Sequence, residues 1–205
     1  NRYVMIKKML SIAGAMALGS VTDAQEDKLG AWYSYFGSQQ LNKTNWNWHN
    51  EVQYRNFNKC GDLEQLLLRT GIGYNLTPGN NNLLLGYGFI HGRPYPDPDL
   101  EDKVTVNEHR LFQQFITKQS ISRVNVQHRY RFEQRFLPDN FKLRFRYLLG
   151  ATVPLNKAAM EANAFYLSAY NEIFIHTDGT LFDRNRSFAG IGYVIKKDLR
   201  FDVGF

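Results

Sequence analysis

The sequence has a single cysteine and no linker-like segment, and both features restrict the possible folds. Cys60 is the one cysteine among 205 residues, so no internal disulfide can hold the structure. No Ser- or Pro-rich linker divides the chain, and no 3.6-residue helical period persists along it. We therefore expect a single domain without helices of any length, in which Cys60 is a free cysteine in a turn.

Long hydrophobic runs are also missing beyond the N-terminus, which argues against a membrane-spanning helix. Near the N-terminus, Lys7 and Lys8 precede the short apolar segment Met9–Leu18, and small residues follow before Gln25. This pattern predicts a secretory signal peptide. We assign residues 1–24 to the signal peptide and upstream residues. An exported protein rarely meets nucleic acid, so we do not interpret the net charge of +6 as a nucleic-acid surface.

Recognisable catalytic and cofactor motifs are absent. The 5 histidines show no metal-ligand spacing, no G-x-S-x-G sequence occurs, and the Gly-rich piece "GYGF" is not followed by a helix. We therefore predict no catalytic residues, no metal and no cofactor, and we expect that the protein is not an enzyme.

What the sequence does contain is strict two-residue alternation. In "VQHRYRFEQRFL" (126–137), one set of alternate residues is mainly apolar and aromatic, while the other holds three arginines and a glutamate. Successive side chains of a strand point to opposite faces, so this pattern predicts a β-strand with one charged face. Clusters of Gly, Asn, Asp and Pro separate ten such segments. These segments lie near residues 31–38, 45–57, 63–75, 82–91, 104–116, 122–136, 141–153, 164–175, 185–195 and 199–205.

Two architectures share this alternation. A soluble periplasmic β-sandwich, acting as a binding protein, would bury the apolar face; a transmembrane barrel turns that face to lipid and the polar face to a lumen. The signal peptide, the strand lengths of about 10–15 residues and a polar face of Arg, Glu, Gln and Gly favour the barrel. We predict an all-β, transmembrane, antiparallel up-and-down β-barrel of about 10–12 strands over residues 25–205, in the outer membrane of a Gram-negative bacterium.

The inward face of this barrel should carry a polar network. Its predicted members are Glu51, Arg55, Arg69, Glu108, Arg110, Gln114, Arg129, Arg131, Glu133, Arg135, Arg144, Arg146, Glu172 and Arg186. Arginines outnumber acids in this set. One interpretation is a plug of internal ion pairs, because narrow barrels fill their interiors with side chains. The other is a small pore or a site for small anions or an acidic ligand, because guanidinium groups suit carboxylate and phosphate.

The outward face should meet lipid. We predict that Trp32, Trp46 and Trp48 form part of an aromatic girdle, and that His109 and His128 lie at the membrane interface. The segments 104–116 and 122–136 could form a hairpin whose tight turn is Lys118–Gln119. In that register His109 lies opposite His128, and Glu108 lies opposite Arg129. An alternative function is a lipid-modifying hydrolase, with a histidine as base and Ser122 or Ser187 as nucleophile.

Several segments together resemble a known family. They are "WNWHNEVQYR" (46–55), "LLLRTGIGYNLTP" (66–78), "NEHRLFQQF" (107–115), "HRYRFEQRF" (128–136), "FRYLLGATVPL" (145–155), "NEIFIH" (171–176) and "DRNRSFAGIGY" (183–193). In order and spacing the chain is similar to the bacterial outer-membrane group called domain of unknown function 2490. The resemblance implies a small outer-membrane barrel and no established activity. It also implies a further strand after Phe205, so we expect this chain to lack a C-terminal strand of the family.

Overall fold

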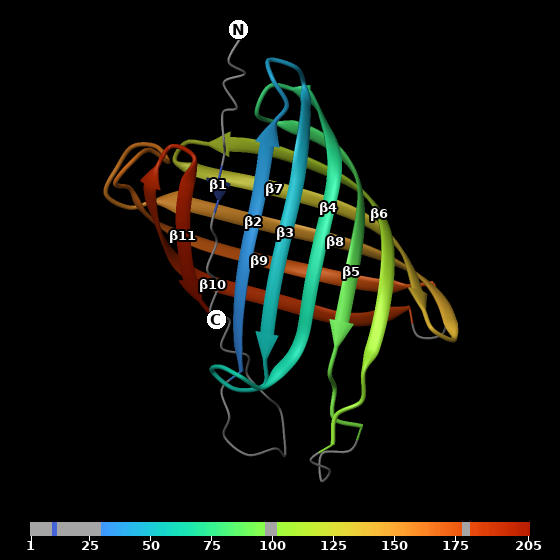
Figure 1. The fold of residues 1–205 in the computed structure, drawn as a ribbon. Coiled ribbons are helices and arrows are strands. Elements are labelled where there is room, and N and C mark those ends of the chain that lie inside the picture. The colour runs from blue at the N-terminus through green and yellow to red at the C-terminus, as the bar shows by residue number, and fades with distance from the viewer. Residues whose placement is uncertain (1–9, 12–29, 97–101, 178–180) are drawn as a thin grey trace, which may run out of the picture.

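The fold is a single antiparallel sheet whose strands follow one another in chain order. The computed structural model describes residues 10–11, 30–96, 102–177 and 181–205, and these ranges contain strands and no helix. No helix of the described ranges has the length and apolarity that a membrane crossing requires. The order β1 to β11 has no crossover (Figure 1). The strands are β1 (Leu10–Ser11), β2 (Ala31–Gln40), β3 (Trp46–Asn56), β4 (Leu63–Thr77), β5 (Asn81–Gly92), β6 (Val106–Ile121), β7 (Val124–Leu137), β8 (Asn140–Pro154), β9 (Phe165–His176), β10 (Phe182–Lys196) and β11 (Leu199–Gly204).

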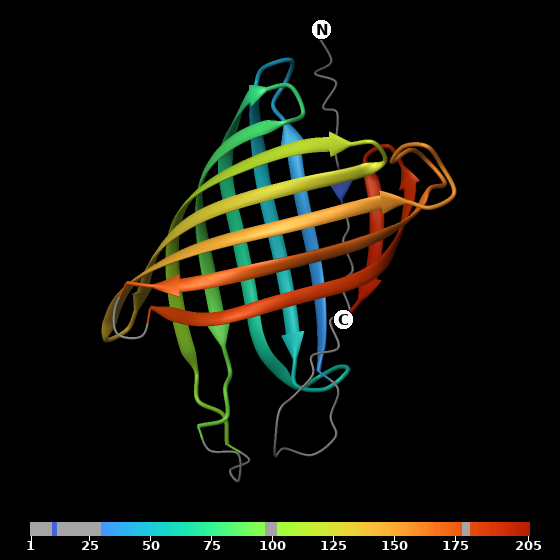
Figure 2. The same ribbon diagram turned by 180° about the vertical axis from the view of Figure 1, so that it is seen from behind.

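The sheet curls on itself into an incompletely closed barrel. Strands β2 to β5 form one wall in Figure 1, and the view from behind in Figure 2 shows β7 to β10 as the opposite wall. The two-residue β1 pairs with β2 and lies beside β11, and in the described strands no ladder joins β2 to β11 directly. The predicted all-β, up-and-down antiparallel architecture is confirmed. The predicted signal peptide lies outside the described residues apart from Leu10–Ser11, and it stays a prediction.

The segment 155–164 between β8 and β9 forms bends and a turn. Strand positions agree with the alternation, but one local prediction is wrong. The turn between β6 and β7 lies at Ser122–Arg123, because Ile121 pairs with Val124, and not at Lys118–Gln119. Ser122 takes a positive φ of 54°, which a two-residue hairpin loop requires and which Gly or Asn more often supplies.

The shifted turn changes every pair between β6 and β7. His109 lies opposite Phe136 instead of His128. Glu108 does not lie opposite Arg129; its carboxylate accepts hydrogen bonds from Arg135, which pairs with Arg110 in the ladder. The face of each residue is unchanged, because a shift by an even number of positions keeps the parity of the strand.

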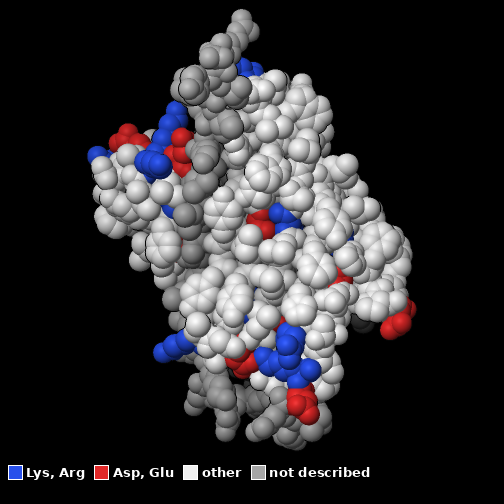
Figure 3. Space-filling view, in the orientation of Figure 1, with Lys and Arg blue, Asp and Glu red and all other residues white. Residues whose placement is uncertain are grey.

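Burial is reversed relative to a soluble β protein. On the outside, Leu85 is 61% exposed and Ile72 47%, whereas Glu133 is 0% and Glu172 2% exposed on the inside. The face seen in Figure 3 is uncharged over most of its middle, apart from a few charged atoms near its centre, and its other charges gather toward the two ends. One curled sheet with a charged interior does not support the soluble β-sandwich as an alternative.

Aromatic rings fill part of the interior beside the charges. Phe112 on β6 is fully buried and lies opposite Gly86 on β5. A Cβ at Gly86 would lie 2.2 Å from the Phe112 Cζ atom, so the absence of a side chain there makes room for the ring. The guanidinium of Arg131 stacks 4.6 Å from the centre of that ring. The interior is therefore a packed region in which arginines lie against aromatic surfaces.

Candidate functional site: the charged interior

The curled sheet brings the predicted polar residues together on its concave side. In an antiparallel sheet, directly paired residues share a face, so the pairs Glu51–Arg69, Gln114–Arg131 and Glu133–Arg144 all point inward. The members of the predicted network whose side chains are buried or contact one another there are Glu51, Arg55, Arg69, Glu108, Arg110, Gln114, Arg129, Arg131, Glu133, Arg135, Arg144, Arg146 and Glu172. Arg186 lies on the same side, against buried Phe174.

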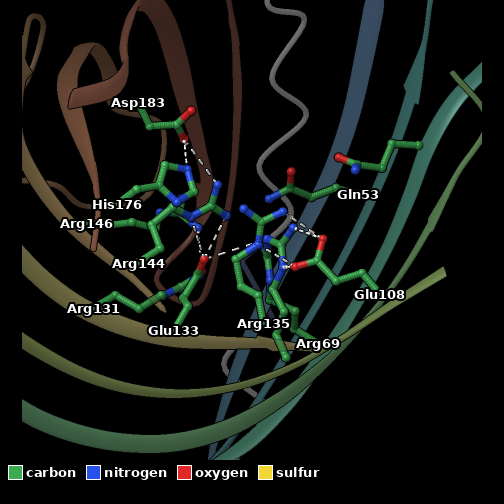
Figure 4. Close-up of polar contacts among 12 residues, drawn as sticks. Gln53, Arg69, Glu108, Arg131, Glu133, Arg135, Arg144, Arg146, His176 and Asp183 are labelled. Carbon is green, nitrogen blue, oxygen red and sulfur yellow. Dashed lines mark hydrogen bonds and ion pairs between the residues drawn. The ribbon is translucent and has the colours of Figure 1, made fainter. Parts of the chain in front are cut away.

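Glu133 is the centre of the densest cluster. Its Oε1 atom accepts a hydrogen bond from Arg146 Nη1 at 2.7 Å, and Oε2 accepts one from Arg144 Nη2 at 2.8 Å. Arg131 and Arg110 approach the same carboxylate at 3.6 and 3.7 Å. Figure 4 shows Glu133 of β7 with Arg144 and Arg146 of β8 directed toward it. A carboxylate with no exposed surface keeps its charge at low cost only with such partners, because burial removes its hydration.

Glu172 extends the cluster to β9. Its Oε1 atom accepts hydrogen bonds from Arg146 Nε at 2.9 Å and from Arg129 Nη2 at 2.8 Å. Arg146 therefore bridges two carboxylates, Glu133 and Glu172, with its two edges. Bridged in this way, β7, β8 and β9 are linked across the interior as well as along their backbone ladders.

A second cluster surrounds Glu108, near the start of β6. Arg110 donates from Nε and Nη2 at 2.6 and 2.8 Å, and Arg135 donates from the same two atoms at 2.5 and 2.9 Å. Both arginines thus bind the carboxylate in the two-point geometry that suits a guanidinium. Glu108 and Arg135 also line a pocket of about 450 Å³, together with Gln65 and Ile90.

Two smaller contacts complete the paired part of the interior. Glu51 forms an ion pair with Arg69 and accepts a hydrogen bond from Gln53 Nε2 at 2.5 Å. Asp183, which the sequence prediction missed, lies 3.0 Å from His176 Nε2 and 3.5 Å from Arg144 Nη1. Its position at the start of β10, beside a turn, gave no alternation signal that would mark it as inward.

Trp32 is placed differently from the prediction. It pairs with Arg55 in the β2–β3 ladder, so it shares the inward face with that arginine. The guanidinium carbons of Arg55 and Arg186 lie 4.0 and 4.7 Å from the centre of its ring. Trp32 is therefore part of the interior and not of the aromatic girdle. Trp46 and Trp48 are 48% and 42% exposed on the outer face.

The outward histidines contact tyrosines. His109 Nδ1 lies 2.6 Å from the Tyr87 hydroxyl, and His128 Nδ1 lies 2.8 Å from the Tyr147 hydroxyl. Ser122 is in the β6–β7 turn, and within the described ranges it makes no hydrogen bond to either histidine.

The other proposed nucleophile is no better placed for hydrolysis. The Ser187 hydroxyl accepts a hydrogen bond from Asn171 at 3.0 Å. The nucleophile–base contact of a hydrolase is thus not formed by the residues that the structure describes. No three His, Cys, Asp or Glu side chains of the described ranges are placed to hold a metal ion, and Cys60 is free and exposed.

Comparison with protein families assigns the chain to a group defined by sequence alone. The family model described as "Protein of unknown function (DUF2490)" matches residues 29–205, which include all ten long strands. The chain belongs to this family. No curated protein and no solved structure matched the chain. The charged interior is therefore the structural feature of this family member that bears most directly on its function.

Proposed function

We propose that this family member is an outer-membrane β-barrel protein, with the convex face of its sheet against lipid and its interior closed by ion pairs. The observation that supports this most strongly is the reversed burial. Large apolar side chains such as Leu83, Leu85 and Ile191 are 47–61% exposed on β5 and β10, whose alternate residues point to the interior. A continuous apolar surface of this kind is stable in a bilayer and prone to aggregation in water.

The strand lengths fit the same proposal. Strands β4 to β10 have 12–16 residues. A tilted strand of about 9–11 residues crosses the hydrocarbon core, so these strands can cross it and extend beyond it. The exposed rings of Trp46 and Tyr74, whose centres lie 5.0 Å apart near the strand ends, would then lie at the membrane interface.

The packing of the interior favours a lumen blocked by side chains over an open pore. The middle of the lumen holds Phe112, Glu133 and Arg131, all at most 3% exposed, and ion pairs join β3 to β4 in one wall and β7 to β8 in the other. Side chains buried in this way favour a blocked lumen at that level. We therefore assign the barrel a structural or ligand-binding role in the membrane.

Membrane insertion is tested by flotation. The full chain, folded into phosphatidylcholine liposomes, should float with the lipid in a density gradient and should migrate differently on a gel before and after boiling. Leu85→Arg should weaken insertion, because a cation on the lipid face costs about 2–4 kcal/mol near mid-bilayer. Glu161→Gln, in the exposed segment between β8 and β9, is the matched control. A protein that stays soluble without detergent and does not float would overturn the proposal.

Closure of the interior is tested in planar bilayers. Inserted protein should give no stable conductance steps, because the ion pairs around Glu133 block the lumen. Regular open-channel steps from the unaltered chain would show that the interior is a pore and would remove the closed-barrel assignment.

A further inference from the structure

Two interior arginines differ from the rest in having no acidic partner. Seven inward arginines each have a carboxylate oxygen within 3.6 Å, namely Arg69, Arg110, Arg129, Arg131, Arg135, Arg144 and Arg146. Arg55 and Arg186 form no ion pair with any described residue. Both stack on the same ring, that of Trp32, although they come from β3 and β10. The unpaired positive charges of the interior are thus gathered at one place.

Arg55 is held firmly but is incompletely satisfied. It is 7% exposed, and its Nη2 and Nη1 atoms donate to the side-chain oxygens of Gln53 and Gln65 at 2.7 and 3.3 Å. Its Nε–H is buried and has no hydrogen-bond partner among the described residues. Both of its acceptors are neutral amides, so they orient the guanidinium without cancelling its charge.

Arg186 adds a second charge beside the first. Its guanidinium lies against the rings of Trp32 and Phe174, at 4.7 and 5.3 Å, and it has no hydrogen-bond partner in the described ranges. Glu172 lies directly opposite Arg186 on β9 but forms no ion pair with it, and its Oε1 atom accepts hydrogen bonds from Arg129 and Arg146 instead. Two guanidinium groups kept together in a partly buried place are costly unless a negative group lies near them.

We propose that Arg55 and Arg186, stacked on Trp32, bind one oxyanion group, a phosphate or a carboxylate. The free N–H edges of two guanidinium groups offer the forked donor geometry that such groups accept. The pocket of about 450 Å³ is lined in part by Gln65, whose Oε1 atom accepts a hydrogen bond from Arg55, so Arg55 lies next to this pocket. This inference rests on the proposed function, because it names the ligand class of the same interior.

The site contains its own reporter. The chain has 3 tryptophans, so the double variant Trp46→Phe, Trp48→Phe leaves Trp32 as the sole indole. Titration of this protein with inorganic phosphate in zwitterionic detergent should give a saturable change in Trp32 emission. Arg186→Gln should weaken the apparent affinity by about tenfold or more, since hydrogen bonds to charged groups contribute strongly.

A matched control separates specific binding from general charge. Arg200→Gln removes an exposed arginine of β11 that does not touch Trp32, and the affinity should stay unchanged. Arg55→Gln should act like Arg186→Gln; if it prevents folding, Arg186→Gln decides alone, because that side chain is only partly buried. A linear, non-saturable response, or equal affinities for the Arg186→Gln and Arg200→Gln proteins, would overturn the site.

The source of the oxyanion is read from nanodiscs. If the ligand is a lipid headgroup, discs with phosphatidylglycerol should already shift Trp32 emission relative to phosphatidylcholine discs, and added phosphate should change nothing further. If it is a free anion, phosphate should titrate equally in both. Either result supports the site. Protein that inserts but responds to neither removes the anion site alone, whereas protein that fails to insert removes the proposed function.

Discussion

Arginine side chains have different partners in two parts of the same interior. Around Glu133 and Glu172, five arginines each have a carboxylate oxygen within 3.7 Å, and Glu133, which has no exposed surface, has four of them around it. Around Trp32, two guanidiniums meet amides and aromatic rings but no carboxylate among the described residues. In the first part the positive charges are paired with carboxylates and hold strands together. In the second part the positive charges have no carboxylate partner, and a site for an anionic ligand needs such uncompensated charge.

The difference lies in which strands meet. Strands β7, β8 and β9 contribute both signs of charge at neighbouring inward positions, so they pair internally. Arg55 lies between Trp32 and Gln65 in its two ladders, and Arg186 lies opposite Glu172, whose Oε1 atom binds Arg129 and Arg146. Whether a carboxylate binds the guanidinium, and not the burial of the arginine, therefore separates the structural arginines from the two at Trp32.

Glu133→Gln should have the largest effect on stability. It leaves guanidinium groups uncompensated in a buried place, which costs about 3–5 kcal/mol in the free energy of unfolding. The urea midpoint of the folded, heat-modifiable form in detergent should fall accordingly. Glu161→Gln, whose carboxylate lies 3.9 Å from Lys157 on the surface, should leave the midpoint unchanged. Equal midpoints for both variants would show that the cluster around Glu133 is not a structural one.

Arg146→Gln should have an intermediate effect. It removes hydrogen bonds to Glu133 and Glu172, but each carboxylate keeps at least one other arginine. We expect a loss of about 1.5–3 kcal/mol, measured by the same urea transition. A loss as large as that of Glu133→Gln would mean that the arginines are not interchangeable partners and that Arg146 holds the network alone.

Arg186→Gln should change stability least, within about 0.5 kcal/mol, because no carboxylate loses its partner. The same substitution type therefore separates the two regions: it costs stability at position 146 and phosphate affinity at position 186. If Arg186→Gln lowered the urea midpoint as much as Arg146→Gln, Arg186 would belong to the structural part of the interior.

Much of this architecture follows from alternation in the sequence. Strands β2 to β11 lie within about three residues of the predicted segments, except that β6 ends five residues later, because charged and apolar positions alternate along most of them. For the same reason the inward face of Arg129, Arg131 and Glu133 could be predicted without knowing the pairing. Parity assigns a side chain to a face, whatever its partner is.

Partner identity could not be predicted, because it depends on turns that carry weak signals. The β6–β7 turn uses Ser122 with a positive φ, and the polar residues from Lys118 onward look equally turn-like. Trp32 was misplaced for another reason. Strand β2 has aromatic residues on both faces, Trp32 and Phe36 on one and Tyr33 and Tyr35 on the other, so its alternation does not say which face is inward.

The placement of the three tryptophans offers the most direct test of the reversed burial and of the interior site together. Three single-tryptophan proteins, retaining Trp32, Trp46 or Trp48, would be inserted into bilayers of lipids brominated in the upper part of the acyl chains. Contact with bromine quenches indole emission. We predict strong quenching of Trp46 and Trp48 and little quenching of Trp32. Quenching of Trp32 as strong as that of Trp46 would contradict its place inside the barrel, and quenching of none would contradict the membrane-facing outer surface.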